Sequence, residues 1–191
     1  MKKARILAKS LIGCAVSISL WGIYTPTKAV QLADGTVAFA KPPRLLDAIT
    51  TFRAVRSRGA KYYFTMIHPE NAEESVGKVT INLRQGADDI EYRLDKTIAA
   101  VGEARDRKAE IAIADATFDP ESETVTVSFA QPVPPGTTFT VGLVPKRNPD
   151  LDGTYLFGVT AFPAGAKTQG IYLGAGRLQF DRPSDSPHSF W

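Results

Sequence analysis

Apolar and polar residues alternate with a period of two along most of the chain, and this pattern restricts the fold to β-structure. In residues 78–84 every second residue is valine, isoleucine or leucine, and the residues between them are polar or charged. Residues 124–129 and 138–143 repeat the alternation, which is typical of strands with one face on the core and one in water. Residues 61–67 and 155–162 are apolar on both faces, so we expect strands that are covered on both sides.

Turn residues separate the expected strands. Residues 119–122 include a proline, Pro134-Pro135-Gly136 forms a second turn signal, and Asp152-Gly153 precedes the strand at 155–162. No stretch keeps a helical period over three turns, and residues 96–110, which come closest, contain a glycine. Short strands with turn signals about every ten residues predict an all-β fold, namely an immunoglobulin-like antiparallel β-sandwich.

The sequence is most explicit about backbone geometry at the second of these turns. In a type II turn Pro135 supplies the fixed φ of the second position and Gly136 the positive φ of the third. In the expected final strand, Gly174-Ala175-Gly176 indicates a β-bulge or a close approach of backbone. We expect the strands together to bury Val79, Ile81, Val125, Val127, Phe139, Val141, Tyr155 and Phe157.

The N-terminus has the order of an export signal. Four basic residues within the first nine precede an apolar run at 11–24, and Thr27-Lys28-Ala29 supplies a small-x-small cleavage site. The run is shorter than the roughly 20 residues that span a bilayer core. We therefore expect residues 1–29 to be a cleaved signal peptide, with the mature chain starting at Val30. The alternatives are a retained anchor and a lipidated Cys14.

Loss of the signal changes the charge and the cysteine content. The first 29 residues hold five of the 23 basic side chains, none of the 20 acidic ones and the single cysteine. The remainder is slightly acidic overall, which disfavours nucleic-acid binding, and it is held together by its core without a disulfide. We expect residues 30–181 to form one sandwich domain, residues 182–191 a flexible tail, and no membrane span after cleavage.

Catalytic and metal-ligating patterns are weak. The chain has only two histidines, His68 and His188, and no G-x-S-x-G motif presents a serine to either. Asn148, Asp150 and Asp152 have the alternate spacing of a calcium loop, but the twelfth position of that loop would be a valine instead of glutamate. We therefore expect no catalytic residues, no metal site and no cofactor.

One cluster of basic residues precedes the expected strand at 61–67. Such a cluster in a slightly acidic domain is able to meet an anionic glycan, a lipid headgroup or an acidic envelope protein, and its alternative is a solvated loop. The weak candidate binding residues are Arg53, Arg56, Arg58 and Lys61.

Two functions remain open at this point. The favoured one is a non-catalytic envelope domain, in the periplasm or outside the cell, that binds a protein or a surface polymer through its loops or a sheet edge. The other is an enzyme that acts on cell-wall or polysaccharide material with two carboxyl groups about 5 to 10 Å apart. The acids available for such a pair are Glu70, Glu73, Glu74, Asp88, Asp89 and Glu91.

Several segments resemble a known family over nearly all of the chain after the signal, from Pro42 to about Phe180. They are Pro42-Pro43-Arg44-Leu45, Tyr62-Tyr63-Phe64, Pro69-Glu70-Asn71-Ala72, residues 132–138, Arg147-Asn148-Pro149, residues 155–163 and Gly176-Arg177-Leu178. Together they are similar to an uncharacterised family of exported cyanobacterial proteins, a domain of unknown function. The resemblance implies a bacterial envelope setting and no particular activity.

Overall fold

The computed structural model describes residues 30–31 and 35–182, so the expected signal peptide and most of the expected tail lie outside the described residues. The described chain is built from strands and one short 3-10 turn, η1 (Leu94–Lys96), and it contains no helix long and apolar enough to cross a membrane. The strands are β1 (Val30–Gln31), β2 (Val37–Ala38), β3 (Arg44–Thr50), β4 (Tyr62–Ile67), β5 (Val76–Gln85), β6 (Ile98–Glu103), β7 (Asp106–Glu110), β8 (Ile113–Asp119), β9 (Thr124–Val133), β10 (Thr138–Leu143), β11 (Gly153–Pro163) and β12 (Ile171–Phe180).

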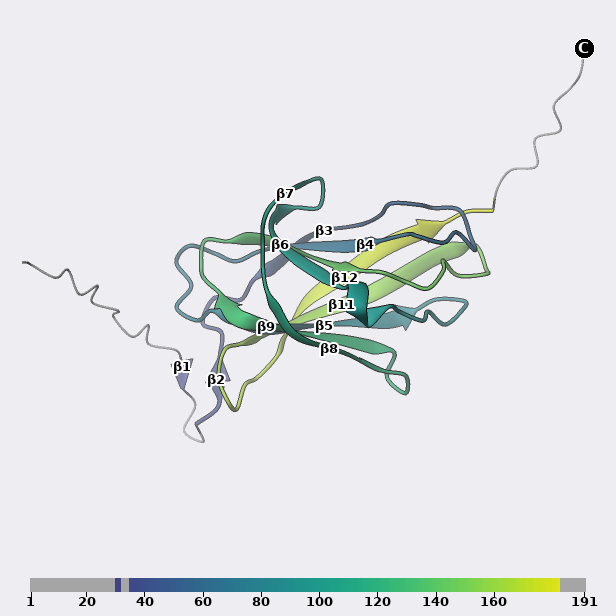
Figure 1. The fold of residues 1–191 in the computed structure, drawn as a ribbon. Helices are drawn as coiled ribbons and strands as arrows, with labels where there is room; N and C mark the ends of the chain where they lie inside the picture. The colour runs from purple at the N-terminus through teal and green to yellow at the C-terminus, as the bar shows by residue number, and fades with distance from the viewer. Residues whose placement is uncertain (1–29, 32–34, 183–191) are drawn as a thin grey trace, which may run out of the picture.

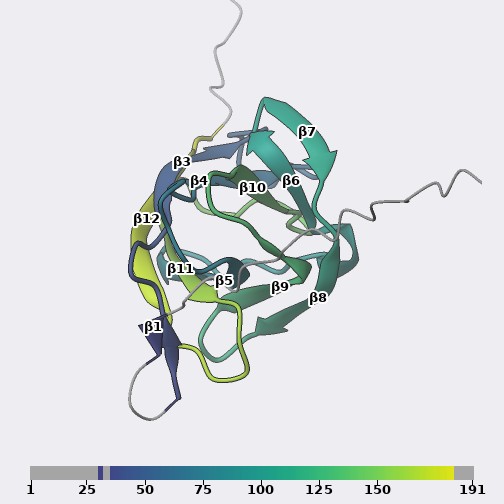
Figure 2. The ribbon, with the colours of Figure 1, turned by 90° about the vertical axis from the view of Figure 1, so that its left-hand side faces the viewer.

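Two antiparallel sheets of five strands face each other (Figures 1 and 2). The first has the order β3-β4-β10-β6-β7 and the second the order β12-β11-β5-β9-β8. This arrangement confirms the predicted all-β class and the immunoglobulin-like antiparallel sandwich. β2 pairs with β1 and, through Val37, with Thr168 of the loop after β11, so β1 and β2 lie outside both large sheets.

The two sheets are joined along both long sides. On one side β12 lies so close to β3 that a Cβ added at Gly176 would be 2.5 Å from the Cβ of Ala48. On the other side the chain crosses between the sheets after β7, where Ile111 donates to the carbonyl of Ala99 (2.8 Å) and Ala112 accepts from the amide of Ala130 (2.8 Å). The close approach expected around Gly174-Ala175-Gly176 is therefore confirmed, and the register of β11 and β12 also shifts beside Gly174.

The core lies between the sheets and is rich in aromatic rings. Tyr62 and Phe64 of β4 contact Phe157 of β11, with ring centroids 5.9 and 5.6 Å apart, and Phe180 lies against Tyr155 at 5.2 Å. All eight residues that alternation predicted to be buried are at most 1% exposed. The alternation of apolar and polar residues therefore predicted these core positions correctly.

The segment that came closest to a helical period forms strands instead. Residues 98–103 and 106–110 are β6 and β7, which join in a tight hairpin. Gly102 has φ +99°, a backbone conformation that costs glycine little and a helix cannot use. The register also shifts between Ala100 and Gly102, and a bulge of this kind breaks the alternation that would reveal a strand.

Gly136 has the predicted positive φ, at +76°. Its amide donates to the carbonyls of His68 (3.0 Å) and Pro69 (3.2 Å), and a Cβ at this position would lie 3.2 Å from Cγ of Glu70. We expect Gly136→Val to lower the free energy of unfolding by about 1–2 kcal/mol, because β-branched residues tolerate positive φ worst. Chemical denaturation measures the change, with Gly136→Asn as the milder control. Equal midpoints for the valine variant and the unmodified protein would contradict it.

Candidate functional site

The four basic residues singled out from the sequence do not share one surface. The segment after β3 turns around the end of the sandwich, so its side chains point in different directions. Arg53 forms an ion pair with Asp181 (2.9 Å), Arg56 forms one with Asp150 (3.2 Å), and Arg58 lines a cleft. Lys61 is exposed just before β4. Two separate sites therefore have to be considered.

The first site is a cleft of about 590 Å³ at the end of the sandwich where three loops meet. We refer to it as the end cleft. Basic and acidic side chains line it in similar numbers, so it has little net charge. Its lining residues are Arg58, Asp88, Asp89, Glu91, Arg93, Lys146, Arg147, Asn148 and Pro149.

Asn148 connects two of these loops from a fully buried position. Its side-chain amide donates to the carbonyls of Phe52 (2.9 Å) and Ala54 (2.8 Å), and its oxygen accepts from the hydroxyl of Tyr62 (2.9 Å). Its backbone amide donates to the carbonyl of Ser57 (2.8 Å). Burial raises the pKa of the Tyr62 phenol, so the group stays protonated and able to donate. Asn148 therefore has a structural role in fixing the loop after β3.

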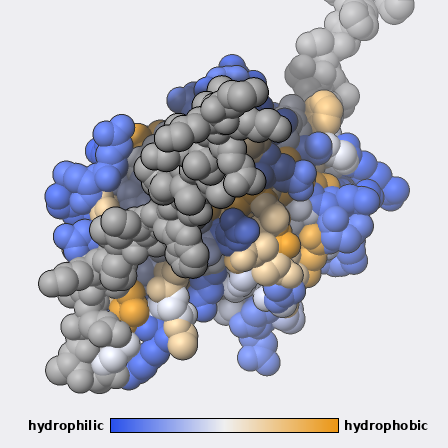
Figure 3. Space-filling view, turned by 60° about the vertical axis from the view of Figure 1, so that its left-hand side comes forward, coloured by the Kyte–Doolittle hydropathy of each residue, from blue (hydrophilic) through white to orange (hydrophobic). Residues whose placement is uncertain are grey.

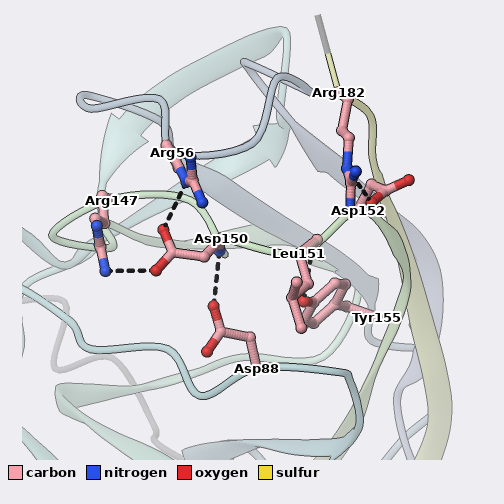
Figure 4. Close-up of polar contacts among 8 residues, drawn as sticks. All are labelled: Arg56, Asp88, Arg147, Asp150, Leu151, Asp152, Tyr155 and Arg182. Atoms are coloured by element: carbon pink, nitrogen blue, oxygen red, sulfur yellow. Dashed lines mark hydrogen bonds and ion pairs between the residues drawn. The ribbon is translucent and has the colours of Figure 1, made fainter.

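Asp150 and Asp152, the two acids considered above as part of a calcium loop, are bound by neighbouring protein groups (Figure 4). The carboxylate of Asp150 accepts from Arg56 Nε (3.2 Å) and Arg147 Nη2 (2.8 Å), and its backbone amide donates to Asp88 Oδ2 (2.7 Å). Asp152 lies apart and pairs with Arg182 (2.7 Å). Within residues 30–31 and 35–182, no three His, Cys, Asp or Glu side chains gather where they could hold a metal ion.

The six candidate acids fall into two groups at opposite ends of β5. Ten residues of strand at about 3.3 Å each separate Glu70, Glu73 and Glu74 from Asp88, Asp89 and Glu91. Glu74 is buried and accepts from the amide of Ala40 (3.0 Å). Glu91 pairs with Lys146 (2.5 Å), which lowers the pKa of its carboxyl.

His68 lies at the same end as Glu74 and is fully buried. Its Nε2 donates to the carbonyl of Glu74 (2.6 Å), and the ring of Phe39 packs edge-on against it at 5.9 Å. Burial lowers the pKa of the imidazole. This environment favours a neutral histidine, which lies between the segment that precedes β3 and the sandwich.

One close carboxyl pair was missed from the sequence. Burial and the neighbouring Asp89 carboxyl of the end cleft raise the pKa of Glu123. Glu123 follows the β8–β9 turn and has φ +49°. Glu123 was not among the acids singled out from the sequence, because it lies far from Asp89 along the chain.

The second site lies on the outer face of the first sheet. Tyr62, Phe64 and Met66 point into the core, so Tyr63 and Thr65 point to the opposite face. The β6–β7 hairpin curls out of the sheet (Figure 2) and covers part of this face. Thr140 donates to the carbonyl of Gly102 (2.7 Å), and the guanidinium of Arg107 lies 4.6 Å from the centre of the Tyr63 ring.

Two hollows lie side by side between this hairpin, β3 and β12. The larger, of about 320 Å³, is lined by Ile49, Thr50, Thr51, Tyr63, Ala104, Arg105 and Arg107. The smaller, of about 240 Å³, is lined by Ala48, Ile49, Thr50, Arg53, Arg105, Arg177, Leu178 and Gln179. Four arginines and no acidic residue line the two hollows. We refer to the pair of hollows as the arginine groove.

Three of these arginines have no carboxylate partner in the described part of the chain. Arg107 donates to the carbonyl of Ala104, Arg177 makes a long contact to Thr154 Oγ1 (3.4 Å), and Arg105 forms no ion pair. The ion pair of Arg53 with Asp181 is itself exposed, at 61% and 50% of the two side chains. Arg53 was a candidate from the sequence, whereas the other three come from distant segments that only the fold brings together.

The large apolar side chains that remain exposed belong to separate segments. Within the described residues they are Leu46, Phe52, Leu151 and Tyr172. The face in Figure 3 is mainly hydrophilic, with some areas of hydrophobic residues. A further hollow of about 480 Å³ is lined mainly by apolar residues and has no arginine or lysine, so it offers no cation to an anionic ligand.

Comparisons with known proteins identify the family of this chain, and solved structures with some similarity to it are also found. The model of the family described as "Protein of unknown function (DUF2808)" matches residues 36–180, and no curated protein matches the sequence. Among solved structures, the collagen-binding subdomain of the Enterococcus faecalis surface protein ACE is 9% identical, with 72% of this chain and 97% of that chain covered and a TM-score of 0.43. The bacterial hydrophobin BslA is 16% identical (73% and 98% covered, TM-score 0.43). The C-terminal domain of the Streptococcus agalactiae polypeptide BspA is 11% identical (73% and 50% covered, TM-score 0.44).

Proposed function

The chain belongs to the DUF2808 family of proteins of unknown function, and we propose that it is an exported, non-catalytic domain that binds an anionic surface polymer through the arginine groove. The observation that carries the proposal is the lining of the two hollows, in which four arginines gather without an acid. The export signal expected in residues 1–29 supports a location outside the cytoplasm.

The chemistry of the groove favours an acidic ligand. A guanidinium presents several donors in a fixed plane and binds carboxylate, sulfate or phosphate groups in a bidentate manner. Arg105, Arg107 and Arg177 are exposed and have no ion pair to break within the described residues. The Arg53–Asp181 pair is surface-exposed, and such pairs contribute only about 0–1 kcal/mol. An anionic ligand is therefore able to displace Asp181 at small cost.

The end cleft is a weaker candidate because its charges are largely satisfied. Lys146 pairs with Glu91 and Arg147 with Asp150, so Arg58 and Arg93 are the cleft cations without an ion pair in the described chain. The cleft also exposes Asp88, Asp89 and Glu91 to any ligand, and these acids repel an anionic polymer. This difference makes Arg58 a suitable control for the groove.

Binding of polygalacturonate, with neutral dextran as the negative control, tests the proposal by isothermal titration calorimetry at low salt. We expect Arg105→Ala to weaken binding about tenfold or more, since a charge-assisted hydrogen bond contributes roughly 1.5–3 kcal/mol. Arg58→Ala removes the same charge from the end cleft and should leave the affinity nearly unchanged. Equal losses in both variants, or equal binding of dextran, would contradict the proposal.

The same samples distinguish binding from catalysis. After prolonged incubation we expect no new reducing ends in the polygalacturonate, because the proposed function is binding without catalysis. Release of reducing ends that is lost in Asp89→Asn would instead support the rival enzyme hypothesis.

A further inference from the structure

We infer that the arginine groove holds two successive acidic units of a linear acidic polysaccharide, one in each hollow, with Arg105 between them. This inference rests on the proposed function and deepens it. It names the ligand as a chain with adjacent carboxylated sugars and states how many of them the groove accepts.

The arrangement of the hollows supports two neighbouring subsites. Both hollows are lined by Ile49, Thr50 and Arg105, so they adjoin along those residues. Each also has cations of its own, namely Arg107 in the larger hollow and Arg53 with Arg177 in the smaller. The larger hollow, at about 320 Å³, lies at the lower end of the range for ligand pockets, about 300–1,000 Å³, and the smaller, at about 240 Å³, lies below it. Each hollow therefore suits a single small unit.

The floor of the groove suits a sugar ring better than a bare phosphate chain. Ile49 is partly exposed and offers apolar surface beside the arginines, which complements the C–H face of a sugar. The hydroxyl of Thr51 accepts a hydrogen bond from the amide of Lys61 (3.0 Å), so its own proton remains free for a ligand oxygen. The structure thus provides apolar contact, a hydroxyl donor and a cation within one hollow.

A third hollow limits the run of acidic units. It has a volume of about 450 Å³ and shares Ile49, Ala104 and Arg105 with the larger hollow of the groove. It is also lined by two acids, Asp47 and Glu103. These carboxylates repel a third acidic unit, so an acidic chain continuing in this direction gains little from further contact.

Titration of the protein with galacturonate oligomers of one to four units tests this inference. We expect affinity to rise about tenfold or more from one unit to two, because the second unit binds as an intramolecular event, and to rise little from two to three. If the groove had only one subsite, either unit of a two-unit oligomer could occupy it. The affinity would then rise only about twofold from one unit to two. Arg107→Ala should remove the gain at the second unit, whereas Arg58→Ala, which removes the same charge from the end cleft, should leave the whole oligomer series unchanged.

The acidic hollow supplies an independent readout. In the double variant Asp47→Asn, Glu103→Gln we expect the three-unit oligomer to gain several-fold in affinity over the two-unit oligomer, because the repulsion has been removed. Sulfated disaccharides and polyphosphate, as further probes, distinguish a carboxylated sugar from other anions; tighter binding of polyphosphate would overturn the assignment to a sugar chain.

Failure of this inference differs from failure of the proposed function. If polygalacturonate binds in an Arg105-dependent manner but the oligomers show no step at two units, the two-subsite arrangement is wrong and the binding function remains. If neither the polymer nor the oligomers bind, both are wrong.

Discussion

Phe139→Ala is expected to lower the free energy of unfolding by about 3–5 kcal/mol, the range for truncation of large buried aromatic side chains. Phe139 is 0% exposed in β10, the central strand of the first sheet. Its ring meets that of Phe129 from the second sheet edge-on, with centroids 5.9 Å apart. Removing the ring leaves a cavity between the two sheets that β-strands cannot close by a small shift.

Chemical denaturation at neutral pH measures this effect, and Thr138→Ala is a control in the same strand. Thr138 precedes Phe139, points to the opposite face and is partly exposed, so its truncation should cost less than about 1 kcal/mol. Similar midpoints for the two variants would mean that Phe139 does not lie in the core between the sheets.

Asn148→Ala is expected to lower the free energy of unfolding by about 2–4 kcal/mol, because several buried groups lose their partners at once. The hydroxyl of Tyr62 loses its acceptor, and the carbonyls of Phe52 and Ala54 lose their donor. A buried polar group without a partner costs roughly 1–3 kcal/mol. Asp150→Asn, which changes a partly exposed carboxylate in the same loop, should cost less than about 1 kcal/mol.

The loss of Asn148 should also reach the arginine groove. The two carbonyls that its amide holds belong to the residues on either side of Arg53. We expect Asn148→Ala to increase hydrogen exchange in the loop after β3 and to weaken polygalacturonate binding without touching the ligand. Unchanged exchange in residues 51–58 would show that this loop is fixed by other contacts.

The sequence predicted the strands whose pattern is regular. β5, β9 and β10 have one face on the core, so alternation identified them and their buried residues correctly. β3 escaped because its register with β4 shifts between Leu45 and Asp47, which places the adjacent Leu45 and Leu46 outside a simple alternation. β6 and β7 escaped because of the shift at Gly102. A bulge changes which residues of a strand face the core, and the types of residue present do not reveal where it occurs.

The candidate site could be predicted only in part for a related reason. Arg53 was visible as one of four neighbouring basic residues, but the fold separates it from Arg56 and Arg58. Its partners in the groove, Arg105 and Arg177, come from a hairpin tip and from the last strand. Residues that are neighbours in sequence were therefore wrongly grouped, and the arginines of the groove were not recognised as a group. The reason is that strand pairing brings together residues from distant segments on the surface of a sandwich.

The closure of the sandwich along both long sides also affects how the molecule behaves among its own copies. An exposed strand edge offers unpaired amides and carbonyls on which another chain can add a strand, and proteins protect such edges with charges or cover. Here β3 and β12 shield each other, β7 carries Asp106, Arg107, Lys108 and Glu110, and β8 carries Asp115 and Asp119. Strand addition at these edges would bury charged groups or separate the sheets, which opposes edge-to-edge association between copies of the domain.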